Sequence, residues 1–218
     1  MGGCVSRINY KAHASVMPRT KIYLFICALA VSYGFVSWWA DRPVRQAPGV
    51  LAKAEPAQTP IDRTAPLEKN GFAIKPLARY EITARVLSKE SYRWDAGAKL
   101  APVDLTTGWG PMSDSAVLDK LEISQGNRWY NWHIDNMAKL PIAVDEINRH
   151  VANMHLIAAD KAVAKQIRNI RPGKIITMRG YLVEVSGKDG FTWRSSLSRE
   201  DSGGGACELM WVESFSVE

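Results

Sequence analysis

The sequence predicts an α+β protein, with a single N-terminal transmembrane helix followed by a small curled antiparallel sheet or OB-like barrel into which two helices are inserted. Three observations carry this prediction. Residues 22–39 form one uncharged apolar run. Several later segments alternate apolar and polar side chains with a period of two, as half-buried strands do. Two stretches, residues 141–154 and 160–170, repeat apolar side chains at helical spacing instead.

The apolar run IYLFICALAVSYGFVSWW is long enough to cross a membrane. As a helix, residues 22–39 would be about 27 Å long, near the roughly 30 Å hydrocarbon core of a bilayer. Trp38 and Trp39 fall where aromatic side chains meet lipid headgroups. The charged residues before the run are all basic, so the positive-inside rule places residues 1–21 in the cytoplasm. We therefore expect residues 22–39 to bind the lipid bilayer as a signal anchor in a bacterial inner membrane.

A cleaved signal peptide is the alternative to an anchor. Its apolar core usually spans about 7–15 residues, which is shorter than this run. Cleavage after Ala40 would put Trp38 where a small residue is needed, and the next acceptable site, Val50–Ala52, lies too far downstream. The sequence therefore favours an uncleaved anchor.

Two further regions follow the anchor. Residues 40–78 hold six prolines among small and polar residues, which predicts a Pro-rich disordered linker. Residues 79–218 have the length of one domain, here a periplasmic α+β domain. This domain contains 18 Lys and Arg and 18 Asp and Glu, so the whole net charge of +6 lies in the first 78 residues. The lack of net positive charge in this domain weighs against nucleic-acid binding. An OB-like domain that binds nucleic acid remains an alternative function.

Within the domain, alternation predicts strands and short polar runs predict the turns between them. The turn Gln125–Asn127 separates two short strands, and Lys188–Gly190 forms a hairpin turn. Residues 91–115 read as irregular, because they contain two turn-forming clusters. The predicted strands are residues 79–88, 118–123, 128–134, 174–185, 191–197 and 207–217.

The first of the two helices begins at Pro141, and the second has Asp160 as its N-cap. Pro172 and Gly173 end the second helix. The apolar positions of the first pattern are Val144, Ile147, Val151 and Met154.

Tryptophan is abundant in the domain and predicts a binding surface. Rigid rings beside polar groups are what a sugar-binding or peptide-binding groove uses, because they bury area with little loss of entropy. A polar run follows Trp193 and ends in a glycine-rich loop. We therefore expect a ligand or partner to bind at Trp109, Trp132, Trp193, Arg194, Ser195 and Arg199.

A small hydrolase that uses His155 with Cys207 or Ser202 is the alternative function. Asp201–Gly204 resembles the DSGG around the nucleophile of trypsin-like serine proteases, but the sequence around the histidines departs from that family. Cys207 could act as a thiol nucleophile with His155 or His150. The alternation in residues 207–217 instead places Cys207 on an apolar strand face, where a free thiol behaves as a small hydrophobic group.

The sequence predicts no metal or other cofactor. Candidate ligands exist, but they lack the CxxC or HExxH spacing of zinc sites. His150 and His155 would point about 140° apart on a continuous helix. The candidate ligands are His133, His150, His155 and Cys207.

Four segments of the domain resemble a group of uncharacterised bacterial inner-membrane proteins that have one N-terminal span and a C-terminal periplasmic domain. These segments are Asn153–Ile157, Arg179–Val183, Trp193–Ser196 and Gly205–Glu208. The resemblance covers the last two-thirds of the chain and implies an envelope location without implying an activity. We therefore expect a membrane-anchored periplasmic binding or assembly module without evident catalysis, whose partner is an envelope protein or a cell-wall component.

Overall fold

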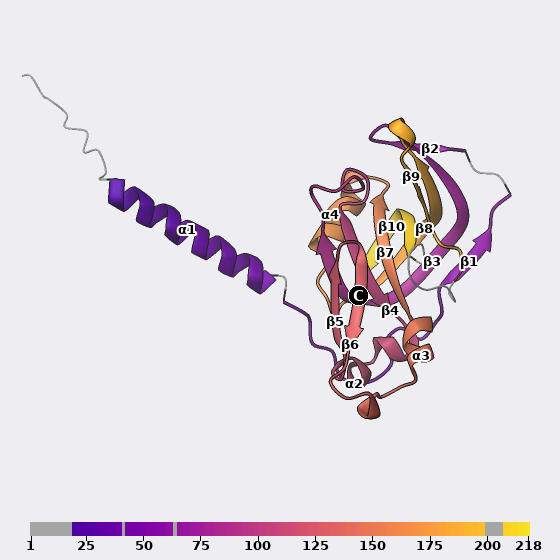
Figure 1. The fold of residues 1–218 in the computed structure, drawn as a ribbon, viewed down its shortest axis with the longest axis horizontal. Helices are drawn as coiled ribbons and strands as arrows, with labels where there is room; N and C mark the ends of the chain where they lie inside the picture. Colours follow the sequence, from indigo (N-terminus) through magenta and orange to yellow (C-terminus); the bar gives the residue numbers. More distant parts are fainter. Residues whose placement is uncertain (1–18, 41, 63–64, 199–206) are drawn as a thin grey trace, which may run out of the picture. The chain divides into compact units, whose positions relative to one another are not determined.

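The computed structural model describes residues 19–40, 42–62, 65–198 and 207–218, without the side chains of residues 19, 36–40 and 189. The chain divides into two units, Met1–Asp41 and Arg42–Glu218. In the first unit, α1 (Arg19–Ala40) is a continuous helix that contains all of residues 22–39, so the helical prediction is confirmed (Figure 1). A search of the described residues finds no helix with the length and apolar character needed to span a membrane.

The second unit combines a large, mostly antiparallel sheet with short helices, which confirms the α+β class. The helices are α2 (Ser115–Leu118), α3 (Val144–Arg149) and α4 (Lys161–Asn169), with 3-10 turns η1 (Gly110–Ser113), η2 (Met137–Lys139) and η3 (Lys188–Gly190). A separate hairpin consists of β5 (Glu122–Gly126) and β6 (Trp129–His133). The strands of the large sheet are β1 (Ala57–Pro60), β2 (Leu67–Lys69), β3 (Phe72–Ser91), β4 (Val103–Gly108), β7 (Val151–Ala158), β8 (Ile175–Ser186), β9 (Thr192–Arg194) and β10 (Glu208–Val217).

Five of these strands close into a ring of hydrogen-bonded neighbours. The 20-residue strand β3 pairs with β8 along its first part and with β4 along its last part, and it bends visibly in Figure 1. From β4 the ring continues through β7 and β10 back to β8. The β7–β10 pair is parallel and the other pairs are antiparallel. Register shifts in β3 at Pro76/Ala78 and Val86/Ser88 mark irregularities of the kind that let a strand curve.

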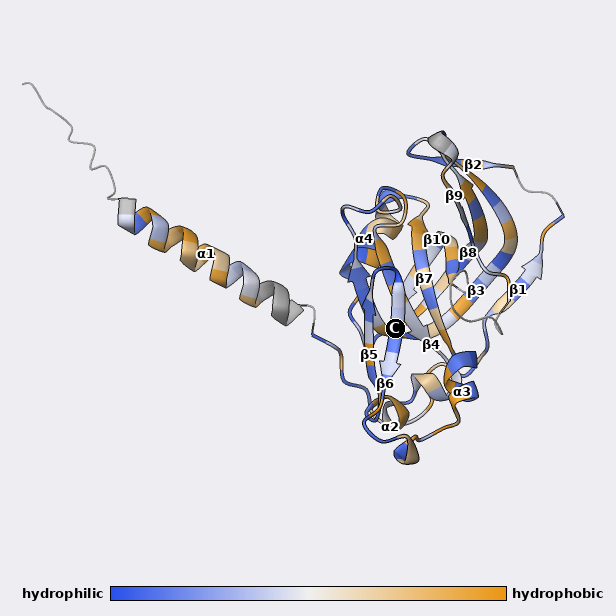
Figure 2. Cartoon of the chain, viewed as in Figure 1, coloured by the Kyte–Doolittle hydropathy of each residue, from blue (hydrophilic) through white to orange (hydrophobic). Residues whose placement is uncertain are grey.

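Apolar side chains fill the inside of this ring and also cover part of its outside. Alternation along β3 is visible in Figure 2, and Tyr80, Ile82 and Ala84 from it belong to the inner core. A second cluster, which includes Ile157 and Leu209, lies on the opposite face of the same strands. Strands β4 and β7 are therefore buried on both faces, and every residue in them is buried.

This two-sided burial explains the wrong helix prediction for residues 150–154. Strand β7 reads VANMHLIA, a nearly continuous apolar run whose spacing also fits a helix. The structure ends α3 at Arg149, and β7 begins at Val151. Strand β4 lies in the segment predicted to be irregular, because its short alternating run Val103–Thr106 is flanked by two turn-forming clusters. The second predicted helix is confirmed as α4, whose N-cap Asp160 accepts a hydrogen bond from the Val163 N–H at 2.8 Å.

The prediction of a disordered linker is wrong for the described part of residues 40–78. The Val44 N–H donates to the carbonyl of Pro172 at 2.7 Å, and β1 pairs with β3. The N–H groups of Leu51 and Ala52 both donate to Ser113 Oγ, at 3.0 and 3.1 Å. Prolines keep this segment extended, and its free N–H groups find acceptors on the domain, so it packs without a core of its own. The folded unit thus begins at Arg42 rather than Arg79.

Candidate functional site

The β5–β6 hairpin carries an arginine in an uncommon backbone conformation. Its two-residue turn has positive φ at both positions, 51° at Asn127 and 68° at Arg128. Such a turn matches the twist of a hairpin, but it favours Gly, Asn or Asp over Arg. Holding a non-glycine residue in the left-handed region costs about 1–2 kcal/mol. Contacts of the Arg128 side chain must therefore offset that cost.

Arg128 makes these contacts as the centre of a polar network on the outer face of β4. Its Nη1 donates to Asp104 Oδ1 at 2.6 Å and to the carbonyl of Ala101 at 2.8 Å. Its Nη2 donates to both carboxylate oxygens of Asp95, at 2.9 and 3.0 Å. The guanidinium also lies 3.8 Å from the ring centre of Tyr92, whose hydroxyl accepts a hydrogen bond from the Arg128 N–H. One side chain thus holds the hairpin against the loop before β4.

Asp104 joins this arginine to a buried histidine. Asp104 on β4 and His155 on β7 are direct partners in the sheet register, and both are buried. His155 Nδ1 lies 2.8 Å from Asp104 Oδ2, close enough for an ion pair between the imidazolium and the carboxylate. Burial would lower the pKa of His155, but Asp104 and the Cys207 thiol outweigh it and raise this pKa to about 9. The imidazole is therefore protonated at neutral pH.

The Cys207 thiol lies beside the same imidazole. It contacts His155, and it accepts a hydrogen bond from Asn153 Nδ2 at 3.3 Å. Asn153 also donates to the main-chain oxygen of Arg128 at 2.7 Å and accepts from Gln125 Nε2 at 2.8 Å. Cys207 is half-buried. The structure therefore brings together a thiol, an imidazole and a carboxylate that lie far apart in the sequence.

Trp193 on β9 covers this group from outside. Its ring centre lies 4.7 Å from that of His155 at an interplanar angle of 49°, and 5.4 Å from the Arg128 guanidinium. A Cβ atom on Gly97 would lie 2.6 Å from the Trp193 ring, so the loop before β4 packs closely on the other side of the indole. His155 is only 3% exposed. Between these groups the imidazole is enclosed.

The three predicted tryptophans do not form one surface. Trp109 is 1% exposed and belongs to the core inside the ring of strands, so its prediction as a surface residue is wrong. Trp132 is half-buried and packs against a different cluster, which contains Met112 and Ile147. Trp193 packs on the second cluster, which contains Ile157 and Leu209 and lies outside the ring.

The predicted polar residues also separate. Arg194 is exposed and donates to Glu184 at 2.7 Å. Ser195 is buried, where its hydroxyl accepts from the Leu209 N–H at 3.1 Å and so fixes the chain after β9 instead of facing a ligand. Arg199 lies outside the described residues.

Of the remaining nucleophile and metal candidates, Ser202 also lies outside the described residues. His150 Nδ1 lies 2.8 Å from the main-chain oxygen of Glu146, and its ring packs near Trp109. Of the two histidines considered as partners of Cys207, His155 is the one that contacts it. Across the described residues, no group of three or more His, Cys, Asp or Glu side chains is arranged to hold a metal ion.

An exposed tryptophan marks a depression that the sequence did not predict. Trp94 is 95% exposed and lies in the loop between β3 and β4. The depression has a volume of about 460 Å³ and opens beside the Arg128 network, since Arg128 and Asp95 both line it. The only sign of this depression in the sequence was the segment Tyr92–Asp95, which lies inside a turn-rich stretch. The lining residues are Ser91, Tyr92, Arg93, Trp94, Asp95, Asn127 and Arg128.

Comparison with protein-family models, curated proteins and solved structures finds no match for this chain. The functional argument therefore depends on the geometry described above.

Proposed function

We propose that this chain is a membrane-anchored periplasmic binding module of the bacterial envelope, held by α1 and built on an OB-type barrel. The absence of charge in residues 22–39 and the basic residues before them in the sequence support the anchor and its orientation.

The connectivity of the ring supports the OB-type assignment. The strands follow the ring order β3–β4–β7–β10–β8, and a helix, α4, lies between the third and fourth strands along the chain. OB barrels bind oligonucleotides or oligosaccharides on the face of their second and third strands and with the loops between strands one and two and strands four and five. Here those strands are β4 and β7, and the first of these loops contains Trp94. The depression therefore lies where this type of barrel binds its ligands.

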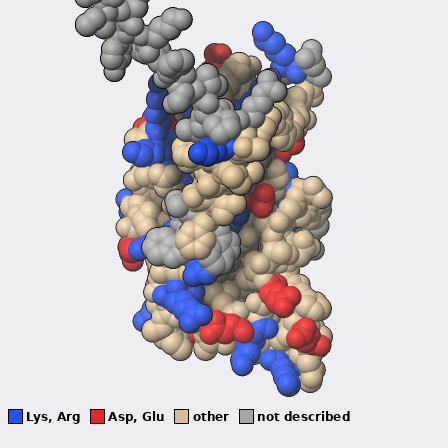
Figure 3. Space-filling model, turned by 90° about the vertical axis from the view of Figure 1, so that its left-hand side faces the viewer, with Lys and Arg blue, Asp and Glu red and all other residues tan. Residues whose placement is uncertain are grey.

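The charge of the surface favours an oligosaccharide over a nucleic acid. On the face in Figure 3, basic and acidic side chains are interspersed, whereas phosphate backbones need a continuous basic surface. The depression offers an exposed indole beside an amide, a carboxylate and guanidinium groups, which suits a sugar ring with several hydroxyls. The 95% exposure of Trp94 is the observation that carries this proposal. We infer that the ligand is a glycan of the cell wall.

Binding of the detergent-purified full chain to purified cell-wall sacculi tests this proposal. We expect Trp94→Ala to weaken binding by about fivefold or more, because the ring supplies the stacking surface. Trp129→Ala is the matched control, since Trp129 is also exposed but does not line the depression. Absent binding, or equal binding by wild type and Trp94→Ala, would refute the glycan site. A photocrosslinker at position 94 that captures one envelope protein would replace the glycan with a protein partner.

Thiol-dependent acyl hydrolysis is a second candidate, because Cys207 contacts a histidine that Asp104 holds in place. In this reaction the Cys207 sulfur attacks an acyl carbon as the bond from that carbon to the leaving oxygen breaks, and the proton that the thiol loses is passed through His155 to the leaving oxygen. Water then attacks the acyl-thioester and restores the thiol. The enclosure of His155 beneath Trp193 places this candidate second.

Turnover of a chromogenic ester by the full chain tests the hydrolase. Activity that Cys207→Ser abolishes and Cys27→Ser retains would support it, because Cys27 lies in α1. No turnover, or turnover that survives Cys207→Ser, would exclude a Cys207 nucleophile.

A further inference from the structure

The loop between β3 and β4 presents two exposed side chains, Arg93 and Trp94, between two residues that Arg128 fixes. On one side, the Tyr92 ring centre lies 3.8 Å from the Arg128 guanidinium, and the Tyr92 hydroxyl accepts from the Arg128 N–H at 2.9 Å. On the other side, both carboxylate oxygens of Asp95 accept from Arg128 Nη2, at 2.9 and 3.0 Å. The backbone of the exposed pair is therefore held before any ligand arrives, which lowers the entropy cost of binding.

Arg93 carries the uncompensated charge of this depression. The lining contains two arginines, Arg93 and Arg128, and one carboxylate, that of Asp95. Arg128 and Asp95 form an ion pair with each other. Arg93 forms no ion pair or side-chain hydrogen bond with any residue that the structure describes. One guanidinium therefore remains available beside Trp94.

A sugar that carries a carboxylate matches this pair of side chains. The ring of the sugar has an apolar face that packs on an indole. A guanidinium donates two parallel, charge-assisted hydrogen bonds to a carboxylate, a geometry that a neutral hydroxyl does not reproduce. Arg93 and Trp94 are consecutive, so their Cα atoms are about 3.8 Å apart and both side chains can reach the same sugar or its neighbour. A neutral sugar would use Trp94 and leave the charge of Arg93 unmatched.

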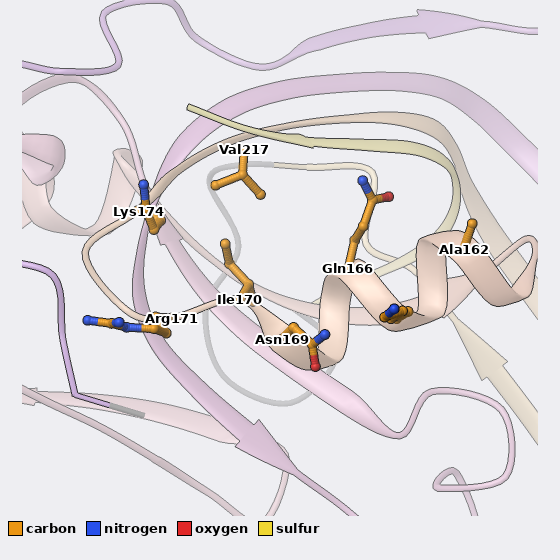
Figure 4. A pocket seen from close by; sticks show the side chains of 8 residues that line it. Ala162, Gln166, Asn169, Ile170, Arg171, Lys174 and Val217 are labelled. Carbon is orange, nitrogen blue, oxygen red and sulfur yellow. The ribbon is translucent and has the colours of Figure 1, made fainter. Parts of the chain in front are cut away.

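Another cavity with cationic side chains, beside α4, suits such a ligand less well. Figure 4 shows this cavity with Arg171 and Lys174 at one end, and its volume of about 540 Å³ exceeds that of the depression. Lys174 Nζ donates to the main-chain oxygen of Glu218 at 3.1 Å, and Arg171 Nε donates to the main-chain oxygen of Arg42 at 3.0 Å. Its described lining contains no aromatic ring on which a sugar could pack. The available guanidinium and the exposed indole occur together at the depression instead.

We propose that the depression selects saccharides that carry a free carboxylate, and that Arg93 determines this preference. The Arg93 guanidinium binds the carboxylate while the sugar ring packs on Trp94. Arg128 holds the loop and does not bind the acid, because its guanidinium already pairs with Asp95. This inference rests on the proposed glycan site and names the class of sugar that the site takes. Its consequence is a preference for glycan whose sugar carboxylates are free over glycan in which they are capped as amides.

Isothermal titration calorimetry of the full chain in detergent, with two forms of one glycan, tests this preference. The first form is soluble cell-wall glycan strands freed of peptide, whose sugar carboxylates are free. The second form is the same strands after carbodiimide coupling to methylamine, which turns each carboxylate into a neutral amide. We expect wild type to bind the free acid about fivefold more tightly, the size of a well-formed exposed ion pair.

Three variants assign the preference to its residue. Arg93→Gln should bind both forms equally, and Arg93→Lys should keep part of the preference, because an ammonium keeps the charge without the paired hydrogen bonds. The control Arg168→Gln removes an exposed arginine of α4 that does not line the depression, and it should behave as wild type. Because Arg93 has no partner among the described residues, Arg93→Gln should unfold at the urea concentration of wild type.

The outcomes separate this inference from the proposed function. Wild type that binds neither form overturns the glycan site, and the preference falls with it. Equal binding of the two forms by wild type overturns the preference for an acid and leaves the glycan site standing. A preference that Arg93→Gln keeps, or that Arg168→Gln also loses, overturns the role of Arg93.

Discussion

Raising the pH should destabilise the folded unit through His155. The pKa of His155 is about 9 in the folded protein, against about 6.5 for an unperturbed histidine in the unfolded chain. Because the folded protein holds this proton more tightly, the stabilisation is fully present below about pH 6.5 and is lost as the pH rises through about 9. Each pKa unit corresponds to about 1.4 kcal/mol. The free energy of unfolding should therefore fall by about 3 kcal/mol between about pH 6 and pH 10.

Urea unfolding of the full chain in detergent, followed by tryptophan fluorescence, measures this change. His155→Gln is the control, because it removes the titrating ring and leaves the Asp104–Arg128 ion pair in place. The remaining titratable groups are common to both proteins, so the difference between their pH dependences isolates His155. Equal losses of stability in wild type and His155→Gln would refute the argument that Asp104 and Cys207 hold an imidazolium here.

Two substitutions test the packing that positions the site. Gly180→Ala should destabilise the protein by about 3 kcal/mol or more in urea unfolding, because the new Cβ would lie 1.9 Å from the carbonyl oxygen of Trp211. Gly126→Ala is its control, since no atom lies within 4 Å of a Cβ there, and a similar loss in both variants would contradict the steric explanation. Ser113→Ala should cost about 2 kcal/mol and speed protease cleavage within residues 42–62, because two N–H groups lose their buried acceptor. Unchanged cleavage would show that the segment is held by other contacts.

The predictable parts of the fold are those with one buried face. Helix α4 carries both a clear apolar stripe and an N-cap, and the β5–β6 hairpin alternates with the period of a strand. Strand β7 could not be assigned in the same way, because burial on both faces removes the alternation. Strand β4 does alternate, but turn-forming clusters on both sides of it predicted an irregular segment. Asn70 and Gly71 form a hairpin turn with positive φ, a signal that was hidden inside a segment interpreted as a linker.

The candidate site was predictable only in pieces. The sequence singled out His155, Cys207 and Trp193, and the structure brings these three together. It gave no signal for Arg128 or Asp104, because their importance comes from a closed ring that places a hairpin turn over β4. The prediction of Trp109 as a surface residue was wrong because composition alone does not distinguish a tryptophan in the core from one at the surface.

Hydroxyl-radical footprinting of the full chain with and without soluble cell-wall glycan strands tests the proposed binding module most directly. Without glycan, Trp94 should be oxidised rapidly and Trp109 hardly at all, given exposures of 95% and 1%. With glycan, the account predicts protection of Trp94, while Trp129 remains as reactive as before. Trp94 oxidised equally in both samples would contradict a glycan site in the depression.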